Sequence, residues 1–460
     1  MLAAGHGRRI KSRTAKVLQP LCGRPVLWHV LDAIRPLRAG KVVLVIRHRG
    51  NDVEEAVTSW NLRLPIEFVE QPDPHGTGHA VMVAEGAVAS ADEVLIANGD
   101  EPLVTAPQFR DLVALRRRRK ASAAVQTTIP EDARGFARVI RDGDELVRLQ
   151  EGAEASREEL EIAEVATGVY AFRREDLFGA LPLVSQDNRQ REYYLPDVLG
   201  ILRDKGERLV VHTVDIGGAV GVNSRLELAR AAAVMRRRIN ADLMSHGVTI
   251  VDPETTFVDV GIRVGNDSTI LPQTFLEGVT RIGEACVIGP GARIADSTVA
   301  DEATIEQSVV REARIGRRAT VGPFSHLRPG SILGADTKVG SFVEVKGSRI
   351  GDGSKVPHLS YVGDTTIGKN VNIGAGTITV NYDGYEKHRT TIGDDVRIGS
   401  DTMLVAPVRI GRGAVTGAGS VITKNVPAGA LAVERAEQRT VAGYRERKDR
   451  QQGRGAGGKA

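Results

Sequence analysis

The second half of the chain carries an aliphatic residue, usually followed by glycine, at every sixth position from Ile282 to Ile422, with a few changes of phase. This period fits neither an α-helix nor an alternating strand, which repeat after about 3.6 and about two residues. It indicates short parallel strands that turn a corner every hexad, with aliphatic side chains inside and glycine at the corners. Because one coil cannot bury its apolar face, we predict a long stack of coils.

The first half alternates short aliphatic strands with helices of apolar periodicity. This order is typical of a mostly parallel sheet covered by helices, so we predict a Rossmann-like α/β domain. The predicted strands are residues 42–46, 66–69, 94–97, 124–127, a strand around 139, 165–172 and 209–214. The predicted helices are residues 26–34, 78–90 and 107–119.

A further helix separates the two patterns. Ser224 and Glu227 have the spacing of a capping box, and Gly247 can end the helix that they begin. The stretch after residue 450 is polar and rich in glycine, which is typical of disorder. We therefore predict an α/β domain at 1–223, a linker helix at 224–247, a repeat domain at 248–443 and a flexible tail at 444–460.

Composition narrows the class of protein. A chain of 460 residues is too long for one compact core, and its 41% hydrophobic and 26% charged residues are typical of globular domains. With a net charge of +4, we read the basic runs as solvated surface or tail and expect no nucleic-acid partner. The two cysteines, Cys22 and Cys286, are far apart in sequence and indicate neither a disulfide framework nor a metal cluster. This cysteine usage fits a reducing cytoplasm. No apolar run could cross a bilayer and no leader is recognisable, so we expect no membrane partner.

A glycine-rich turn with basic side chains opens the chain at residues 2–9 and is followed by Lys16. Small residues let backbone N–H groups approach a triphosphate, and cations neutralise its charge. Alone, such a segment is more often a plain turn. Asp100, however, follows the strand at 94–97, at the kind of edge where open α/β sheets bind ligands. By itself Asp100 could equally cap the next segment.

The hexad repeat breaks at residues 379–389, where a polar loop leaves the coil. Insertions in repeat proteins often carry function. His358 precedes this loop by one to two coils, and a lone histidine is more often structural than catalytic. Its neighbours favour catalysis, because coils that can stack beside it supply phosphate-binding cations and hydroxyl-binding groups. These neighbours are Arg328, Lys346, Tyr361, Asn372 and Asn381.

Together these motifs resemble a known family over essentially the whole chain. The motifs are Ala3-Ala4-Gly5 with a following Lys16-Val17-Leu18, Gly76-Thr77-Gly78-His79-Ala80, Gly99-Asp100, Glu192-Tyr193-Tyr194, Gly221-Val222-Asn223 and the hexapeptide repeat. They resemble the bifunctional bacterial N-acetylglucosamine-1-phosphate uridyltransferase / glucosamine-1-phosphate acetyltransferase. The resemblance implies an α/β nucleotidyltransferase followed by a left-handed parallel β-helix, a homotrimer with shared acetylation sites, and a cytoplasmic location in bacteria.

For the first half, the resemblance implies transfer of a uridylyl group from UTP to N-acetylglucosamine 1-phosphate, with release of pyrophosphate. It implies that Asp100 and Asn223 hold Mg²⁺, a hard cation that needs few protein oxygens beside phosphates and water. It also implies a nucleotide and sugar site. The members are Leu2, Ala3, Ala4, Gly5, Gln71, Gly76 and Thr77 for uridine, Arg9 and Lys16 for phosphates, Glu151 for the sugar, and Asn98, Gly99, Ala137 and Ala166 beside them.

For the second half, the resemblance implies acetyl transfer from acetyl-CoA to the amine of glucosamine 1-phosphate. His358 would be the general base, since imidazole can accept a proton near neutral pH. The other implied residues match the family throughout. They are Arg328 and Lys346 for the phosphate, Tyr361, Asn372 and Lys387 for the sugar, and Ala375, Asn381, Tyr382, Ser400, Ala418 and Arg435 for acetyl-CoA.

The first half also departs from the family. The chain opens inside the first motif, so we expect the first strand to be nearly absent, leaving ladder groups and core faces without partners. Compared with the family, Arg8 replaces a threonine, Ala137 a glycine, Ala15 a proline and Ala166 an asparagine. The last change removes sugar hydrogen bonds, at a cost of roughly 1 kcal/mol. Two alternatives therefore stay open beside the bifunctional enzyme: an acetyltransferase with an impaired uridylyl site, and a non-enzymatic scaffold with a nucleotide-sensing domain.

Overall fold

The computed structural model describes the chain except for residues 6, 48, 74, 131, 143–144, 153, 216–220 and 453–460. It divides into two compact units, Met1–Asp242 with Phe257–Gly261 and Leu243–Thr256 with Ile262–Ala460. Helix α8 (Arg225–Ser245) spans the boundary, at the place where the sequence predicts a linker helix. The Glu227 N–H donates to Ser224 Oγ at 3.2 Å, so that serine caps α8 as the spacing predicts.

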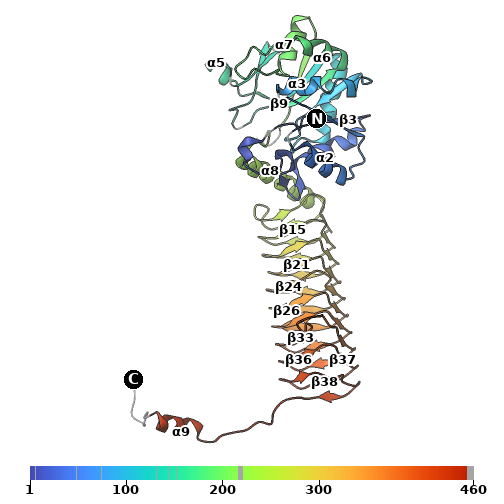
Figure 1. Cartoon of the computed structure of the whole chain (residues 1–460), viewed down its shortest axis with the longest axis vertical. Coiled ribbons are helices and arrows are strands. Elements are labelled where there is room, and N and C mark those ends of the chain that lie inside the picture. Colours follow the sequence, from blue (N-terminus) through green and yellow to red (C-terminus); the bar gives the residue numbers. More distant parts are fainter. Residues whose placement is uncertain are drawn as a thin grey trace. The chain divides into compact units, whose positions relative to one another are not determined.

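The first unit is built on a six-stranded mixed sheet and a separate parallel pair of strands, β3 and β4 (Figure 1). Two pairs of strands are parallel, β3 with β4 and β6 with β10, whereas β9 runs antiparallel to both β5 and β6. The hairpin β7–β8 extends the sheet beside β9. The strand bounds are β3 Val42–Ile46, β4 Ile66–Glu70, β5 Glu93–Ile96, β6 Ala123–Thr128, β7 Arg138–Asp142, β8 Glu145–Gln150, β9 Val165–Arg173 and β10 Leu209–Thr213, and a two-residue pair, β1 Pro20–Leu21 and β2 Arg24–Pro25, precedes them.

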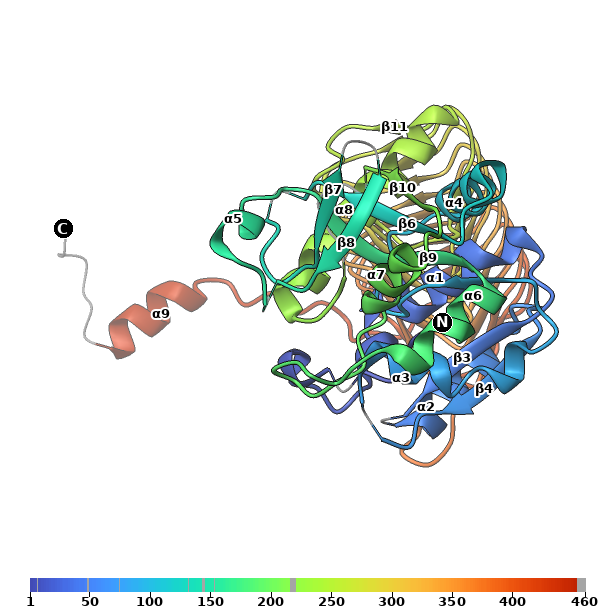
Figure 2. The ribbon, with the colours of Figure 1, turned by 90° about the horizontal axis from the view of Figure 1, so that it is seen from above.

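Helices cover this sheet, with α4 packed on β6 and β10 (Figure 2). Phe109 and Leu112 of α4 are fully buried in a core with Leu31 of α1 and Leu44 of β3. The predicted helix at 78–90 is too long: α3 ends at Met82, and only a short 3₁₀ turn follows at Gly86, a poor helix former. The helix bounds are α1 Val26–Ile34, α2 Gly50–Ser59, α3 Gly76–Met82, α4 Ala106–Arg119, α5 Arg157–Leu160, α6 Arg174–Ala180 and α7 Asp197–Asp204.

Residues 1–3 lie between β3 and β5, where a further strand of the sheet is expected. Leu2 makes isolated parallel bridges to Val45 and Asn98, and its N–H donates to the Ala97 carbonyl at 2.9 Å. A cavity of about 1030 Å³ adjoins these residues and is lined by apolar side chains of β3 and β5. Within the described residues, the two facing strand edges are thus joined only near Leu2, and the core faces beside them open into this cavity.

The second unit is a stack of short parallel strands that form three long sheets (Figure 1). The stack begins at β11 (Thr249–Ile250) and ends at β40 (Leu431–Ala432), and each sheet takes nearly every third strand. The hexad pattern therefore corresponds to a parallel β-solenoid. The coils between residues 326 and 416 include the strands β24 His326–Leu327, β26 Lys338–Ser341, β27 Glu344–Lys346, β29 Lys355–His358, β30 Tyr361–Gly363, β32 Asn372–Ile373, β33 Ile378–Val380, β34 Thr390–Ile392, β35 Arg397–Ile398, β36 Met403–Val405 and β38 Val415–Thr416.

The interior of the stack is aliphatic, and close backbone approaches explain its glycines. Val339, Val356 and Leu404 are fully buried. A side chain at Gly340 would clash with the carbonyl oxygen of Pro357 on the next coil, so glycine alone fits there. This close approach lies directly beside His358.

The region predicted as a flexible tail contains helix α9 (Tyr444–Gln451), whose residues are largely exposed. Arg445 and Asp449, four residues apart, form an ion pair of 3.7 Å that favours this helix. Residues 453–460 lie outside the described part of the chain. None of the described helices is both long and apolar enough to cross a membrane.

Candidate active sites

A cavity of about 490 Å³ opens at the edge of the first unit's sheet, and most residues predicted for the uridylyl site line it. Two predicted residues do not line it. Arg9 is exposed, and Gly99 lies against Ala3, which a side chain at this position would contact. The predicted residues in the lining are Leu2, Ala3, Ala4, Gly5, Lys16, Gln71, Gly76, Thr77, Asn98, Asp100, Ala137, Glu151, Ala166 and Asn223.

Two oxygen ligands converge on one cationic group in this cavity. The Lys16 ammonium donates to the Asp100 carboxylate and, at 3.0 Å, to the amide oxygen of Asn223. Asn223 is itself held in place, because its backbone N–H donates to the Glu227 carboxylate at 2.6 Å. Residues more than a hundred positions apart thus form one compact cation-binding corner.

The donor set at this corner fits Mg²⁺. One carboxylate and one amide oxygen are hard ligands, and Mg²⁺ commonly takes its remaining ligands from phosphates and water. Among the described residues, no group of three or more His, Cys, Asp and Glu side chains is placed to hold a metal ion. A Zn²⁺ site of the usual type is therefore absent from that part of the chain, whereas Asp100 and Asn223 suffice for a phosphate-bound Mg²⁺.

Backbone contacts shape the opposite wall around Gly76. Gly78 N–H donates to the Tyr193 carbonyl at 2.8 Å, and Leu195 N–H donates to Thr77 Oγ1 at 3.1 Å. A side chain on Gly76, which has φ of 94°, would clash with the Tyr193 backbone. These contacts explain why the sequence needs glycine here and join the two motifs around residues 76 and 193.

The far end of the cavity is acidic. Burial raises the pKa of Glu151, and the charges of Asp197, Glu154 and Glu192 raise it further. Burial also raises the pKa of Glu101, which sits deep beside Asp100. Several lining residues were not predicted as site residues, although some of them stand inside the motifs around residues 17, 80, 192 and 221, and the others lie next to Ala137, Ala166 or Asp100 or near the motif at 192–194. The missed residues are Val17, Ala80, Glu101, Gly135, Phe136, Thr167, Gly168, Tyr170, Glu192, Leu195, Pro196 and Gly221.

In the second unit, His358 heads a column of small residues on consecutive coils. Its side chain is exposed, and its carbonyl accepts from the N–H of Gly376. The same bond recurs one coil further at Ala375 and again at Ser400, whose carbonyl accepts from Gly419 at 2.9 Å. Arg435 completes the column by donating to the Ala418 carbonyl at 3.0 Å. The structure thus aligns His358, Ala375, Ser400 and Ala418, as their common register on the coils requires, and Arg435 reaches this column from the segment after β40.

Three predicted cations gather at another corner of the same coils. Arg328 directly follows β24 and Lys346 ends β27, the strand paired with β24, so the two residues come from neighbouring coils. The Arg328 guanidinium pairs with Glu344 at 2.8 Å. A side-chain hydrogen bond with Lys346 lowers the pKa of Lys387, and the positive charge of Lys346 lowers it further. This concentration of positive charge fits a phosphate.

Asp364, which the sequence analysis missed, links these cations to the polar loop. Its carboxylate accepts from the Asn381 amide at 2.6 Å and lies 3.5 Å from the Lys346 ammonium. The Tyr361 hydroxyl lies over Gly363 beside the Asn381 amide, so a side chain at Gly363 would meet both. The sequence signal available for Asp364 was its position at a coil corner, directly after a glycine.

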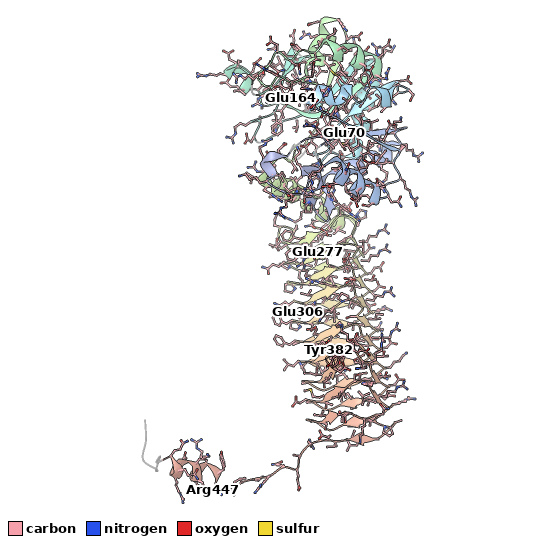
Figure 3. All side chains as sticks on the ribbon, in the orientation of Figure 1. Glu70, Glu164, Glu277, Glu306, Tyr382 and Arg447 are labelled. Atoms are coloured by element: carbon pink, nitrogen blue, oxygen red, sulfur yellow. The ribbon has the colours of Figure 1, made fainter. Side chains whose placement is uncertain are left out.

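Two further predicted residues belong to this region. Tyr382 projects from the polar loop with its hydroxyl donating to the Gly384 carbonyl at 2.6 Å, and Figure 3 labels it on the stack. Asn372 stands on β32, in register with Lys355 of the strand that ends in His358. The structure therefore places all the predicted acetyl-site residues on a continuous set of coils from β24 to the segment after β40.

Comparison with known proteins gives matches over both units. A family model described as MobA-like NTP transferase domain matches residues 1–195. One described as GMPPB C-terminal domain matches residues 256–350, and one described as bacterial transferase hexapeptide (six repeats) matches residues 389–424.

Curated relatives match nearly the full chain. The bifunctional protein GlmU of Exiguobacterium sp. is 43% identical over 450 residues, which cover 97% of this chain and 99% of the relative. Its counterpart from Shouchella clausii is 44% identical, covering 95% of this chain and 96% of the relative. That of Listeria welshimeri is 42% identical, covering 97% of each.

Proposed function

The chain belongs to the family of the bifunctional GlmU proteins, and on that premise we propose how its two sites act in turn on one amino sugar phosphate. It is an enzyme of UDP-N-acetylglucosamine biosynthesis with a nucleotidyltransferase unit and a hexapeptide-repeat acetyltransferase unit. The second unit acetylates glucosamine 1-phosphate with acetyl-CoA. The first unit then transfers UMP from UTP to the N-acetylglucosamine 1-phosphate and releases pyrophosphate.

Acetyl transfer takes place beside His358. The amine of the sugar attacks the thioester carbonyl carbon, a C–N bond forms, the C–S bond breaks, and coenzyme A leaves. The exposed imidazole of His358 accepts the proton that the amine loses. Arg328, Lys346 and Lys387 hold the sugar phosphate by their charge. The observation that carries the proposal is the column of small residues from His358 to Ala418, which leaves room for an extended thioester arm along the coils.

Uridylyl transfer takes place at the cation corner of the first unit. A phosphate oxygen of N-acetylglucosamine 1-phosphate attacks the α-phosphorus of UTP, a P–O bond forms, and the bond to the leaving pyrophosphate breaks. Asp100 and Asn223 would hold Mg²⁺, which supplies charge neutralisation for the phosphates when bound. The Lys16 ammonium contacts Asp100 and so lies beside the proposed metal position. There its positive charge would help neutralise the phosphates during transfer. Gln71, Gly76 and Thr77 form the wall that would face the base.

We extend the proposal to a cytoplasmic homotrimer with acetylation sites shared between neighbouring stacks. An exposed apolar ridge next to His358 supports association. Phe324 and Phe342 stack at 5.4 Å on consecutive coil corners, and Leu359 continues the ridge, with side chains 53%, 59% and 63% exposed. Two free thiols, Cys22 and Cys286, suit a reducing compartment. Light scattering of the wild type and of Phe342→Glu tests the assembly, since a charge on this ridge should yield smaller species.

Paired substitutions test the two activities. His358→Ala should abolish most acetyl transfer and spare uridylyl transfer, whereas Asp100→Asn should do the reverse. If the Ala166 and Ala137 replacements have disabled the first site, the wild type will acetylate but release no pyrophosphate from UTP. Acetyl transfer that survives His358→Ala unchanged would contradict His358 as the general base, and a wild type without either activity would favour the scaffold interpretation.

A further inference from the structure

Glu101 is a carboxyl group sealed beneath the nucleotide cavity, and neither transfer described above uses it. Its side chain is only 4% exposed although it contributes to the cavity lining. Its Oε1 accepts a hydrogen bond of 2.7 Å from the Asn98 amide nitrogen. Its Oε2 is buried without a hydrogen-bond partner among the described residues. A buried acid of this kind is costly, so a role in the site must offset it.

Two glycines hold the Glu101–Asn98 pair in place. Gly168 of β9 lies directly against it, and a side chain there would clash with both the Asn98 amide nitrogen and Glu101 Oε1. On the other side, a Cβ at Gly221 would lie 3.9 Å from Glu101 Cγ. The pair is therefore packed between two backbone segments, which restricts both side chains to this arrangement.

The hydrogen bond to Glu101 fixes the orientation of the Asn98 side-chain amide. Because the amide nitrogen donates to Glu101, the amide oxygen remains as an acceptor, and no described residue donates to it. Asn98 and Ala166 line the same cavity. The alanine has no hydrogen-bonding side chain, so Asn98 supplies an acceptor in a region that Ala166 leaves apolar.

We propose that Asn98 is a specificity-determining residue that accepts a hydrogen bond from a hydroxyl group of the nucleotide or the amino sugar, and that Glu101 is the positioning residue that orients it. The proposal rests on the uridylyl transfer proposed above. Hydroxyl donors are present on the ribose of UTP and on the hexose, and the chemistry of recognition is the same for both.

The test compares KM and kcat of uridylyl transfer for UTP and for N-acetylglucosamine 1-phosphate. Glu101→Gln keeps an oxygen that can accept from Asn98, whereas Glu101→Leu keeps the volume and removes it. We expect Asn98→Ala and Glu101→Leu to raise the KM of the same substrate by about tenfold, the worth of one hydrogen bond. Glu101→Gln should stay within about twofold of the wild type. An increase for UTP assigns the hydroxyl to the ribose, and one for the sugar phosphate assigns it to the hexose.

A double variant separates orientation from a general structural effect. If Glu101 acts through Asn98, then Glu101→Leu in the Asn98→Ala background should add little, because the two effects are coupled. Multiplicative losses, an unchanged KM in Asn98→Ala, or equal losses in Glu101→Gln and Glu101→Leu would each overturn the proposal. Should Glu101→Leu melt far below the wild type, Glu101→Gln and Asn98→Ala still decide.

Binding distinguishes failure of this proposal from failure of the proposed function. Calorimetric titration of each variant with UDP-N-acetylglucosamine requires no turnover. Wild type that binds this nucleotide sugar without transferring uridylyl would count against the proposed activity alone. The same tenfold pattern in Kd would then still support the Asn98 assignment, and an unchanged Kd in Asn98→Ala would overturn it.

Discussion

The Asp364 carboxylate accepts a hydrogen bond of 2.6 Å from the amide of Asn381, which joins a corner of one coil to the loop that interrupts the repeat. The same carboxylate lies 3.5 Å from the Lys346 ammonium. One acidic side chain therefore orients a cation and an amide that come from separate segments. It also offsets part of the repulsion between Lys346 and Lys387.

Asp364→Asn removes this negative charge and should lower kcat/KM for acetyl transfer by about tenfold, as expected for loss of a charge-assisted hydrogen bond. Uridylyl transfer should not change. Asp352→Asn is the matched control, because Asp352 also pairs with a lysine, Lys369 at 3.1 Å, outside the predicted site. Equal losses in the two variants would contradict a positioning role for Asp364.

Removal of divalent cations should separate the two activities. The first site offers oxygen ligands from Asp100 and Asn223, whereas the predicted acetyl site relies on His358 and cationic side chains. Excess EDTA is therefore expected to stop pyrophosphate release and to leave coenzyme A release intact, with recovery on addition of Mg²⁺. Loss of both activities in EDTA would show that the assignment of the metal to the first unit is wrong.

The stack depends on its aliphatic interior. Leu404→Ala, at a fully buried position, should reduce the free energy of unfolding by about 2–5 kcal/mol. Leu431→Ala is the control, since this leucine is 67% exposed on the same stack and its loss should cost less than about 0.5 kcal/mol. Chemical denaturation followed by circular dichroism measures both. Similar costs would mean that the hexad leucines do not form the core.

His29 makes the stability of the first unit depend on pH. Burial lowers its pKa from the usual value of 6.5, and its Nε2 lies 2.8 Å from the Leu21 carbonyl oxygen, which can accept a hydrogen bond from the ring N–H. As pH falls below 6.5, the unfolded chain binds a proton that the folded chain excludes, so stability decreases. His29→Gln keeps a donor and should flatten this loss in thermal melts between pH 7.5 and about 5.5. An unchanged pH profile would contradict it.

The repeat domain was the most predictable part of the fold, because each hexad places one aliphatic side chain in the interior and the register follows from simple counting. The strands of the first unit were also predictable from their buried aliphatic runs. The antiparallel course of β9 was not, since pairing direction depends on tertiary contacts and a run such as 165–172 reads the same in either orientation. Gly86 shortened a helix that apolar spacing alone predicted to continue.

The sites were predictable where a motif carried them and not where distant segments meet. Resemblance led to Asp100 and Asn223, but the Glu227 carboxylate that fixes Asn223 was expected only to cap α8. Glu101 carried no signal, since a glutamate in sequence looks solvent-exposed until β9 covers it. Asp364 could not be predicted either, because its partner Asn381 lies 17 positions away, across a coil corner.

The central claim is that one chain carries out both transfers. Its most direct test is to incubate the purified wild type with glucosamine 1-phosphate, acetyl-CoA, UTP and Mg²⁺ and to identify the products by mass spectrometry. We predict UDP-N-acetylglucosamine, coenzyme A and pyrophosphate in equal amounts, and N-acetylglucosamine 1-phosphate with coenzyme A alone when UTP is omitted. Accumulation of N-acetylglucosamine 1-phosphate with no nucleotide sugar in the complete mixture would contradict it.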